Sequence, residues 1–391
     1  MAQAIFFAFG LILPVFYDPE QFGAFAVLMT TVNVFAIVAA VRMDVLLMLP
    51  RQKAEAQQLF LLGLRFVWVA SFFFVLSAPI FFYFRLVPNI GQALLYVSIA
   101  SFFGFFSLFR SYLLKLNWLK QYARWSVVFA LIVSLSQVVF YFIGIKAGLI
   151  FGYGMGLVGV SFWMAYKIYQ EQDFHLDRQQ ANTIFKRYSS IVRYAYPSGV
   201  LNAVALNILP VIITGIFSLK VAGLYFLANT LLNKPISVLS GSIGQSYYKT
   251  AVNLMSKSNL RRLTKYTLLA TGGLVIVLLS VSLLTVKYIL IPWYGDQWNL
   301  VISYMNWLLP FVLMKALFNP ISSLAEILDK TKMELFFSIS MILIIIVAAY
   351  WGNRSGEILV FIKWYALLGA LAYLSLLLFF ANLLLKSSDN E

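Results

Sequence analysis

The sequence contains no cysteine and a single histidine, and charged residues make up only 11% of it against 62% hydrophobic residues. Without cysteine the chain has no disulfide framework and no thiolate ligand for a metal ion. One histidine, His175, leaves little material for zinc or imidazole chemistry. The sequence therefore predicts no metal site. So few charges also exclude a soluble globular domain, and we expect a polytopic, all-α membrane protein.

Motifs for enzymatic chemistry are missing as well. The sequence has no nucleotide-binding loop, no nucleophile constellation and no metal-ligand spacing. The glycine-rich stretch FGYGMG, with Gly152, Gly154 and Gly156, lies in an apolar run, where small residues favour close helix contact. A nucleotide fingerprint would need a strand before it. We therefore predict no catalytic residues and no cofactor.

Long apolar runs are what the chain has instead. Each is long enough, or nearly long enough, to cross a bilayer as a helix. The first is short and has neither the charged start nor the cleavage site of a signal peptide, so we expect a slightly truncated beginning. The twelve runs cover residues 2–17, 22–41, 59–82, 92–109, 125–143, 148–166, 197–217, 221–241, 266–290, 301–325, 335–351 and 359–385.

Lysine and arginine are distributed unequally over the loops between these runs. One alternate set of loops and ends carries about twenty of them and the other set about five. Positive loops stay in the cytoplasm, so both termini should be cytoplasmic. Positive loops that face anionic membrane lipids account for the net charge of +15. We therefore expect anionic lipids as partners and do not expect the protein to bind nucleic acid.

The second half of the chain looks like a diverged copy of the first. The stretch VAGLYFLANTLLNKP, from Val221, aligns without a gap with the stretch two hundred residues earlier, and this places Gly23 on Gly223 and Asn33 on Asn233. Six helices per copy is an even number, so both copies enter the membrane in the same sense. We predict two parallel six-helix bundles with a central cavity, over residues 1–166 and 197–391.

A polar connector, residues 167–196, joins the two predicted bundles. Its apolar residues are spaced to form one face of an amphipathic helix. We expect it to lie along the cytoplasmic interface as a tether rather than as a regulatory element. The face comprises Ile184, Phe185, Tyr188, Ile191 and Val192.

Two lysines lie at similar depth inside the runs of the second half. Lys234 is followed by Pro235, which removes the backbone bond to Leu231 and favours a kink. Lys315 lies in WLLPFVLMKALFNP. A buried ammonium is costly and is usually kept for a substrate or ion path, so we predict that both bind an anionic ligand, such as a phosphate group. The alternative is that each stem reaches a wet cavity without binding anything, as we expect for Lys363 near a helix end.

The charges of the first half lie closer to the cytoplasm. Arg42 and Asp44 end the second run and are positioned to pair locally, and Arg65 sits one to two turns inside the third. Together, Arg42 and Arg65 could form a positive mouth through which an anionic headgroup enters. Snorkelling of Arg65 to the interface is an equally good explanation.

Amide side chains also occur inside the runs. They suit sugar hydroxyls, but they equally bond helices to each other, and the second role is the commoner one. Asn33 and Asn233 are the better glycan candidates because the repeat places them equivalently beside the predicted cavity, and Asn229 lies one turn from Asn233.

Two blocks of sequence resemble bacterial polysaccharide biosynthesis proteins of the O-antigen flippase type. The first block is YDPEQFGAFAVLMTTVNVF with RMDVLLMLP and EAQQL, and the second begins YAYPSGVLNAVALNILP and includes AGLY and NKP. The resemblance implies a twelve-helix fold of the multidrug/oligosaccharidyl-lipid/polysaccharide (MOP) exporter superfamily, in the bacterial cytoplasmic (inner) membrane. Arg42 and Asp44 occupy the arginine and acidic positions of that family.

The resemblance implies a function as well. Family members move polyprenyl-diphosphate-linked oligosaccharides from the cytoplasmic to the outer leaflet by alternating access, without being enzymes. The lipid-linked glycan would be the substrate, and glycan polymerases or glycosyltransferases are expected partners. Two alternatives stay open: a cation-coupled multidrug exporter of the same superfamily, and a non-transporting scaffold for a glycan-assembly complex.

Overall fold

A computed structural model describes residues 1–50, 52–84, 86–171, 177–254, 257–328, 330 and 332–386. These residues are almost entirely helical and include no strand. They form two compact units, Met1–Gly223 and Leu224–Glu391, and the division falls inside one long helix, α12. The all-α prediction is confirmed.

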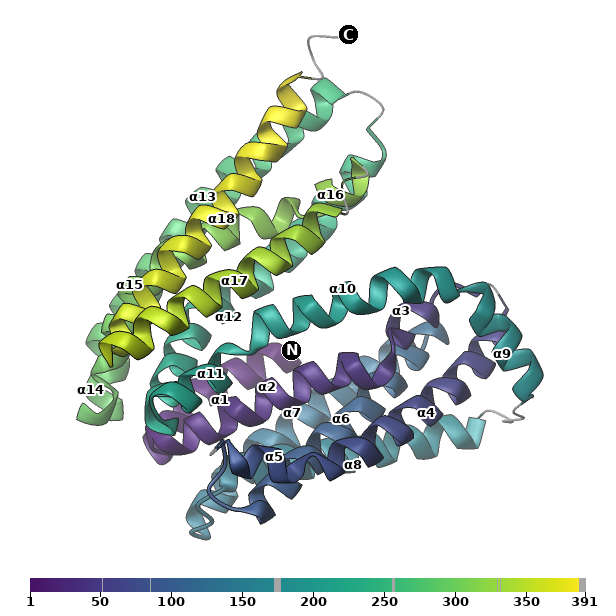
Figure 1. The fold of residues 1–391 in the computed structure, drawn as a ribbon, viewed down its shortest axis with the longest axis horizontal. Helices are drawn as coiled ribbons and strands as arrows, with labels where there is room; N and C mark the ends of the chain where they lie inside the picture. The colour runs from purple at the N-terminus through teal and green to yellow at the C-terminus, as the bar shows by residue number, and fades with distance from the viewer. Residues whose placement is uncertain are drawn as a thin grey trace. The chain divides into compact units, whose positions relative to one another are not determined.

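The first unit contains eleven helices and the start of α12 (Figure 1). They are α1 (Ala2–Phe16), α2 (Pro19–Ala40), α3 (Met43–Leu46), α4 (Lys53–Leu76), α5 (Ala78–Tyr83), α6 (Ile90–Lys115), α7 (Leu119–Phe142), α8 (Gly148–Glu171), α9 (Arg178–Arg187), α10 (Ser189–Asn207) and α11 (Leu209–Ile216).

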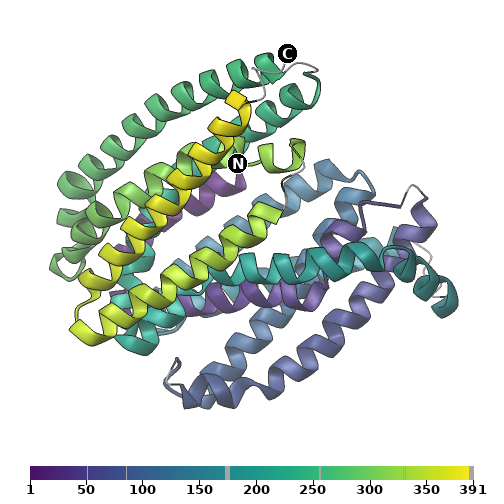
Figure 2. The same ribbon diagram turned by 45° about the horizontal axis from the view of Figure 1, so that its top comes forward.

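The second unit contains the rest of α12 and the helices that follow it. The main ones are α12 (Leu219–Val252), α13 (Lys257–Thr285), α15 (Leu300–Phe318), α17 (Lys332–Ser355) and α18 (Ile358–Lys386). Short helices α14 (Ile291–Tyr294) and α16 (Leu324–Ile327) lie between them. Within this unit α18 packs on α15 and α17, and α13 packs on α15, which can be followed in the turned view (Figure 2).

Nine helices of the described chain are long and apolar enough to cross a membrane, and the bent pair α10–α11 makes a tenth if it is one span. The protein is therefore a multi-pass membrane protein. Helix α1, with 15 residues, is shorter than these. Helix α12 is long enough but falls outside the group because Asn229, Asn233 and Lys234 lower its mean hydropathy. The exact arrangement of twelve spans in two parallel bundles stays a prediction.

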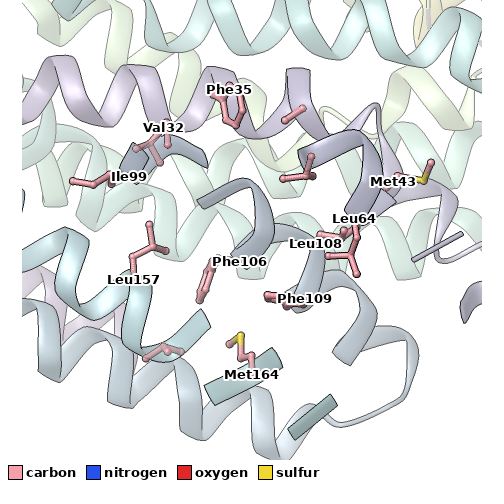
Figure 3. Close-up of a cluster of buried hydrophobic side chains, with 14 of the residues drawn as sticks. Val32, Phe35, Met43, Leu64, Ile99, Phe106, Leu108, Phe109, Leu157 and Met164 are labelled. Atoms are coloured by element: carbon pink, nitrogen blue, oxygen red, sulfur yellow. The ribbon is translucent and has the colours of Figure 1, made fainter. Parts of the chain in front are cut away.

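The core of the first unit is built where α2, α4, α6, α7 and α8 pack together. Figure 3 shows part of its buried apolar cluster. Glycines make the closest helix contact there: a Cβ on Gly152 would lie 2.6 Å from Gln137 Cγ, and one on Gly156 would lie 2.5 Å from Val133 Cγ2. The predicted packing role of FGYGMG is thus confirmed, because α8 approaches α7 along these glycines.

The connector helix α9 is attached to α4. Ile184 is 3% exposed and belongs to the first unit's core, while Phe185 packs against Phe66. At the surface, Arg187 donates a hydrogen bond of 3.0 Å to Glu55, which raises the pKa of the arginine. Part of the expected apolar face therefore packs on protein. Residues 172–176 of the predicted connector and the side chain of Ile191 lie outside the description.

Candidate functional site

Helix α12 carries Lys234 on an exposed position of the second unit. It continues through Pro235 as one helix, and the carbonyl of Leu231 that the proline leaves free accepts a hydrogen bond of 3.2 Å from Ser282 on α13. One turn earlier, the amide of Asn233 donates to Asn229 Oδ1 at 2.7 Å. The Leu231 carbonyl therefore keeps a hydrogen-bond partner although Pro235 cannot donate to it.

Helix α15 holds Lys315 half-buried against aromatic rings of the second unit. Its Nζ lies 5.8 Å from the ring centroid of Phe311, within the range of a cation–π contact. The Phe311 ring in turn packs at 4.9 Å on Tyr365 and at 5.7 Å on Tyr373. Gly369 on α18 makes this approach possible, since a Cβ there would lie 2.7 Å from the Phe311 ring.

The ammonium of Lys315 has no acidic partner in the described part of the chain. No hydrogen bond or ion pair to it is found there, and its charge is compensated only by the face of Phe311. The described residues also include no group of carboxylates, histidines or cysteines that could hold a metal ion. The predicted binding of an anion at Lys315 therefore stays a prediction, and the described surroundings of its ammonium leave the positive charge without an acidic partner.

In the first unit, Asn207 at the break between α10 and α11 accepts hydrogen bonds from α2. The two helices are bent by 50°, and Pro210 follows the break. The carbonyl of Asn207 is thereby free to accept a hydrogen bond of 2.7 Å from Thr30 Oγ1, and its side chain accepts one of 3.2 Å from Asn33 Nδ2. Asn33 thus has a helix–helix bond, and its predicted contact with glycan stays a prediction.

Arg42 starts α3 in an unusual backbone conformation. Both Val41, at φ 46°, and Arg42, at φ 60°, are left-handed, which is costly for a β-branched residue. The resulting turn lays the Arg42 side chain along Gly199 of α10, where a Cβ would lie 3.1 Å from Arg42 Cδ. The side chain of Asp44 lies outside the description, so the predicted pair is not described. Arg65 is exposed on α4, and a shared positive mouth stays a prediction.

The glycines that the repeat aligns contact each other's segments. A Cβ on Gly23 would overlap the carbonyl oxygen of Leu219, and a Cβ on Gly223 would overlap the carbonyl oxygen of Pro19. The two contacts are reciprocal: each glycine meets the residue four positions before the other glycine, and Pro19 and Leu219 are equivalent in the predicted repeat. The first turns of α2 and α12 therefore touch backbone to backbone inside the first unit.

Sequence reasoning identified the two lysines and the paired glycines but missed their surroundings. The spacing of residues along one run could not predict the ring cluster of Phe311, Tyr365 and Tyr373, because these rings come from different helices. The same holds for the hydrogen bond from Ser282 to Leu231. The signal available was Gly369, the one glycine of the predicted run 359–385.

No protein-family model and no curated protein sequence matches this chain. Solved structures do match its fold. A multidrug resistance MATE family transporter of the MOP superfamily, in an inward-facing conformation, has a TM-score of 0.71 at 14% identity, over 99% of this chain and 96% of that one. The lipid II flippase MurJ, in an inward closed conformation, has a TM-score of 0.74 at 12% identity, over 96% and 86%. A MATE structure in a bent conformation has a TM-score of 0.57 at 14% identity, over 99% and 94%.

These likenesses define the class of fold. The chain has the fold shared by MATE transporters and the MurJ flippase, both transporters rather than enzymes. This likeness bears out the fold that the two sequence blocks imply, while the superfamily and its narrower O-antigen flippase branch stay predictions.

Proposed function

We propose that the protein is a MOP-superfamily flippase that moves a polyprenyl-diphosphate-linked oligosaccharide, or a related polysaccharide precursor, to the outer leaflet. The observation that carries the proposal is Lys315, a half-buried cation on α15 with no described acidic partner. A diphosphate supplies the negative charge that this position lacks. The protein would act in the bacterial inner membrane with both termini in the cytoplasm.

The proposed cycle uses the cations predicted from the sequence. Arg42 and Arg65 would attract the headgroup from the cytoplasmic leaflet, and Lys234 and Lys315 would bind the diphosphate. Asn229 and Asn233 offer amides to the glycan while the prenyl tail stays in lipid. Closing one side and opening the other completes the step. Moving a negative charge outward is favoured by about 2.3 kcal/mol per 100 mV of inside-negative potential.

A multidrug exporter is the second candidate. Its support is the match to the MATE transporter over 99% of this chain and 96% of that one, a closer agreement in extent than the 86% of MurJ that is covered. Such an exporter of cations would place carboxylates at the binding position. The two proposals therefore differ in the sign of the charge that the substrate carries.

The deciding experiment uses the purified protein in proteoliposomes. Movement of a fluorescent polyprenyl-diphosphate glycan is measured by its accessibility to an added quencher, beside uptake of a cationic dye. We expect glycan movement that Lys234→Ala with Lys315→Ala reduces at least about tenfold, the worth of one charged hydrogen bond. The matched control is Lys363→Ala, whose ammonium lies 4.4 Å from the Trp307 ring and should not bind substrate.

The native cell gives a second readout. Deleting the gene, or introducing the double lysine variant, should leave lipid-linked glycan accumulated on the cytoplasmic side. An unchanged glycan pool, together with dye transport that survives the double variant, would replace the flippase proposal by the exporter.

A further inference from the structure

A cavity of about 710 Å³ lies in the first unit where α7 begins and α8 ends. It is separate from the lysines, glycines and amides described above. Its lining combines three tryptophans with two cations, an acidic side chain and an amide. The residues that carry the argument are Trp118, Trp125, Trp163, Arg124, Lys167 and Glu171.

The tryptophans form the apolar part of this cavity. Trp125 is 5% exposed and its ring lies 6.3 Å from that of Trp163, which is 45% exposed. Trp118 immediately precedes α7. Tryptophan rings are favoured at the level of lipid headgroups, where one edge is wet and the other is apolar. The cavity thus has the lining that fits the glycerol and upper acyl region of a lipid.

The cations form its polar part. Arg124 is exposed on the first turns of α7 and makes no ion pair or hydrogen bond with any described residue. Lys167, near the end of α8, is half-buried and bonds only to the neutral Gln170 side chain among the described residues, at 3.3 Å. Both belong to the loops that the charge distribution predicts to be cytoplasmic. Two such cations in the lining of one cavity suit a phosphate.

We propose that this cavity binds an anionic phospholipid of the cytoplasmic leaflet, with its phosphate between Arg124 and Lys167 and its glycerol backbone against Trp125 and Trp163. The charged side chains of the lining, Arg124, Lys167 and Glu171, sum to a net charge of +1, which favours a lipid of net negative charge over a zwitterionic one. The site is independent of the proposed transport.

The test uses full-length protein purified in a neutral detergent. Phosphatidylglycerol and phosphatidylcholine with identical acyl chains are titrated in turn, and retained lipid is counted by native mass spectrometry beside the thermal unfolding midpoint. We expect phosphatidylglycerol to be retained preferentially. The variant Arg124→Gln with Lys167→Gln should bind it about 25-fold more weakly, about fivefold for each cation near the membrane surface.

Two further variants make the test specific. Arg261→Gln with Arg262→Gln removes two exposed cations from α13 in the second unit and should leave retention unchanged. Glu171→Gln should tighten binding, an outcome that a merely damaged fold would not give. A loss in the α13 variant equal to that in the cavity variant would mean diffuse attraction and overturn the site.

The source of the phosphate is tested separately. Glycerol 3-phosphate, which carries the phosphate without acyl chains, should not displace the retained lipid at millimolar concentration. Displacement would assign the cavity to a soluble anion and overturn the lipid proposal. Equal retention of phosphatidylcholine by the unmodified protein would overturn it as well. None of these measurements depends on transport, so their outcome tests the lipid site independently of the proposed function.

Discussion

Helices α2 and α12 occupy the same place in the two predicted repeats, yet their middles differ in kind. Where α2 has Val34 and Phe35, α12 has Lys234 and Pro235. Val34, the counterpart of Lys234, is half-buried, and Phe35, the counterpart of Pro235, is buried and stacks on Phe74 at 4.3 Å, whereas Lys234 is exposed. In α2 this pair of positions is apolar and contributes to packing. The second copy has kept it polar, which suits a role in binding.

The asparagines that the repeat pairs differ in the same way. Asn33 bonds to Asn207 on another helix, while Asn233 bonds to Asn229 one turn away on its own helix. An interhelical bond holds two elements together, but a bond within a helix only orients an amide. Asparagines at equivalent positions of the predicted repeat thus make different kinds of hydrogen bond. The sequence alignment alone could not distinguish these two roles.

The largest effect on stability is expected at Gly23 and Gly223, where the two predicted repeats have the same residue. Gly23→Ala or Gly223→Ala places a methyl group into the opposing backbone, so the helices must move apart at a cost of about 3 kcal/mol or more. The thermal unfolding midpoint in detergent should fall sharply. Gly273→Ala on α13, with nothing within 4 Å of the added atom, is the control. Comparable midpoints for all three variants would show that the contact is not made in the protein.

Lys234→Val gives the second copy the residue of the first and should have the next largest effect. Stability should hold or rise, because an exposed charge at membrane depth is replaced by an apolar side chain. Movement of the diphosphate probe should fall about tenfold or more with the loss of one charged hydrogen bond. The paired measurement is unfolding and transport on the same preparation. A variant that transports normally would place the substrate elsewhere.

A smaller effect should separate the two asparagines. Asn33→Ala removes a bond between α2 and α10, and double-mutant data on membrane helices put such bonds at about 0.6 kcal/mol. Asn233→Ala breaks only a contact within α12, so its unfolding should match the unmodified protein. Unfolding in a mild denaturant measures both. Equal destabilisation by the two variants would remove the distinction drawn here.

The smallest effect concerns the connector. Glu55→Gln weakens the bond to the exposed Arg187, and we expect a slight loss of α9 protection in hydrogen exchange that vanishes in high salt. Because the pair raises the pKa of Arg187, its contribution is complete at neutral pH and is lost only as the pH rises through the arginine's range. A change in protection between pH 6 and pH 8 would point to another group.

Much of the fold could be predicted from the sequence, because apolar length and periodicity decide which segments become membrane helices. Each of the twelve predicted runs is mostly helical in the described chain, although runs 59–82, 197–217 and 301–325 cross a break between helices, and FGYGMG packs as expected. The exceptions have physical causes. Polar residues in α12 weaken its membrane signal, and the break at Asn207 depends on Pro210 together with a bond from Thr30.

The candidate site was less accessible to sequence reasoning. A lysine in an apolar run is visible in the sequence, but its neighbours are set by how helices pack. Phe311 reaches Tyr365 and Tyr373 only because Gly369 leaves room, and Ser282 meets Leu231 from a run fifty residues away. Val41 and Arg42 adopt left-handed backbone conformations that the sequence does not predict, because neither residue is the glycine or asparagine that usually marks such a position.

The continuity of α12 has a mechanical consequence. Since one unbroken helix joins the two compact units, a displacement of either unit is transmitted along it as bending or as movement of the whole rod. Bending requires least force where a backbone hydrogen bond is missing, and Pro235 removes one directly after Lys234. The Ser282 hydroxyl compensates the Leu231 carbonyl at this place. A ligand bound to Lys234, as proposed above, would therefore lie beside the point of α12 that lacks a backbone hydrogen bond.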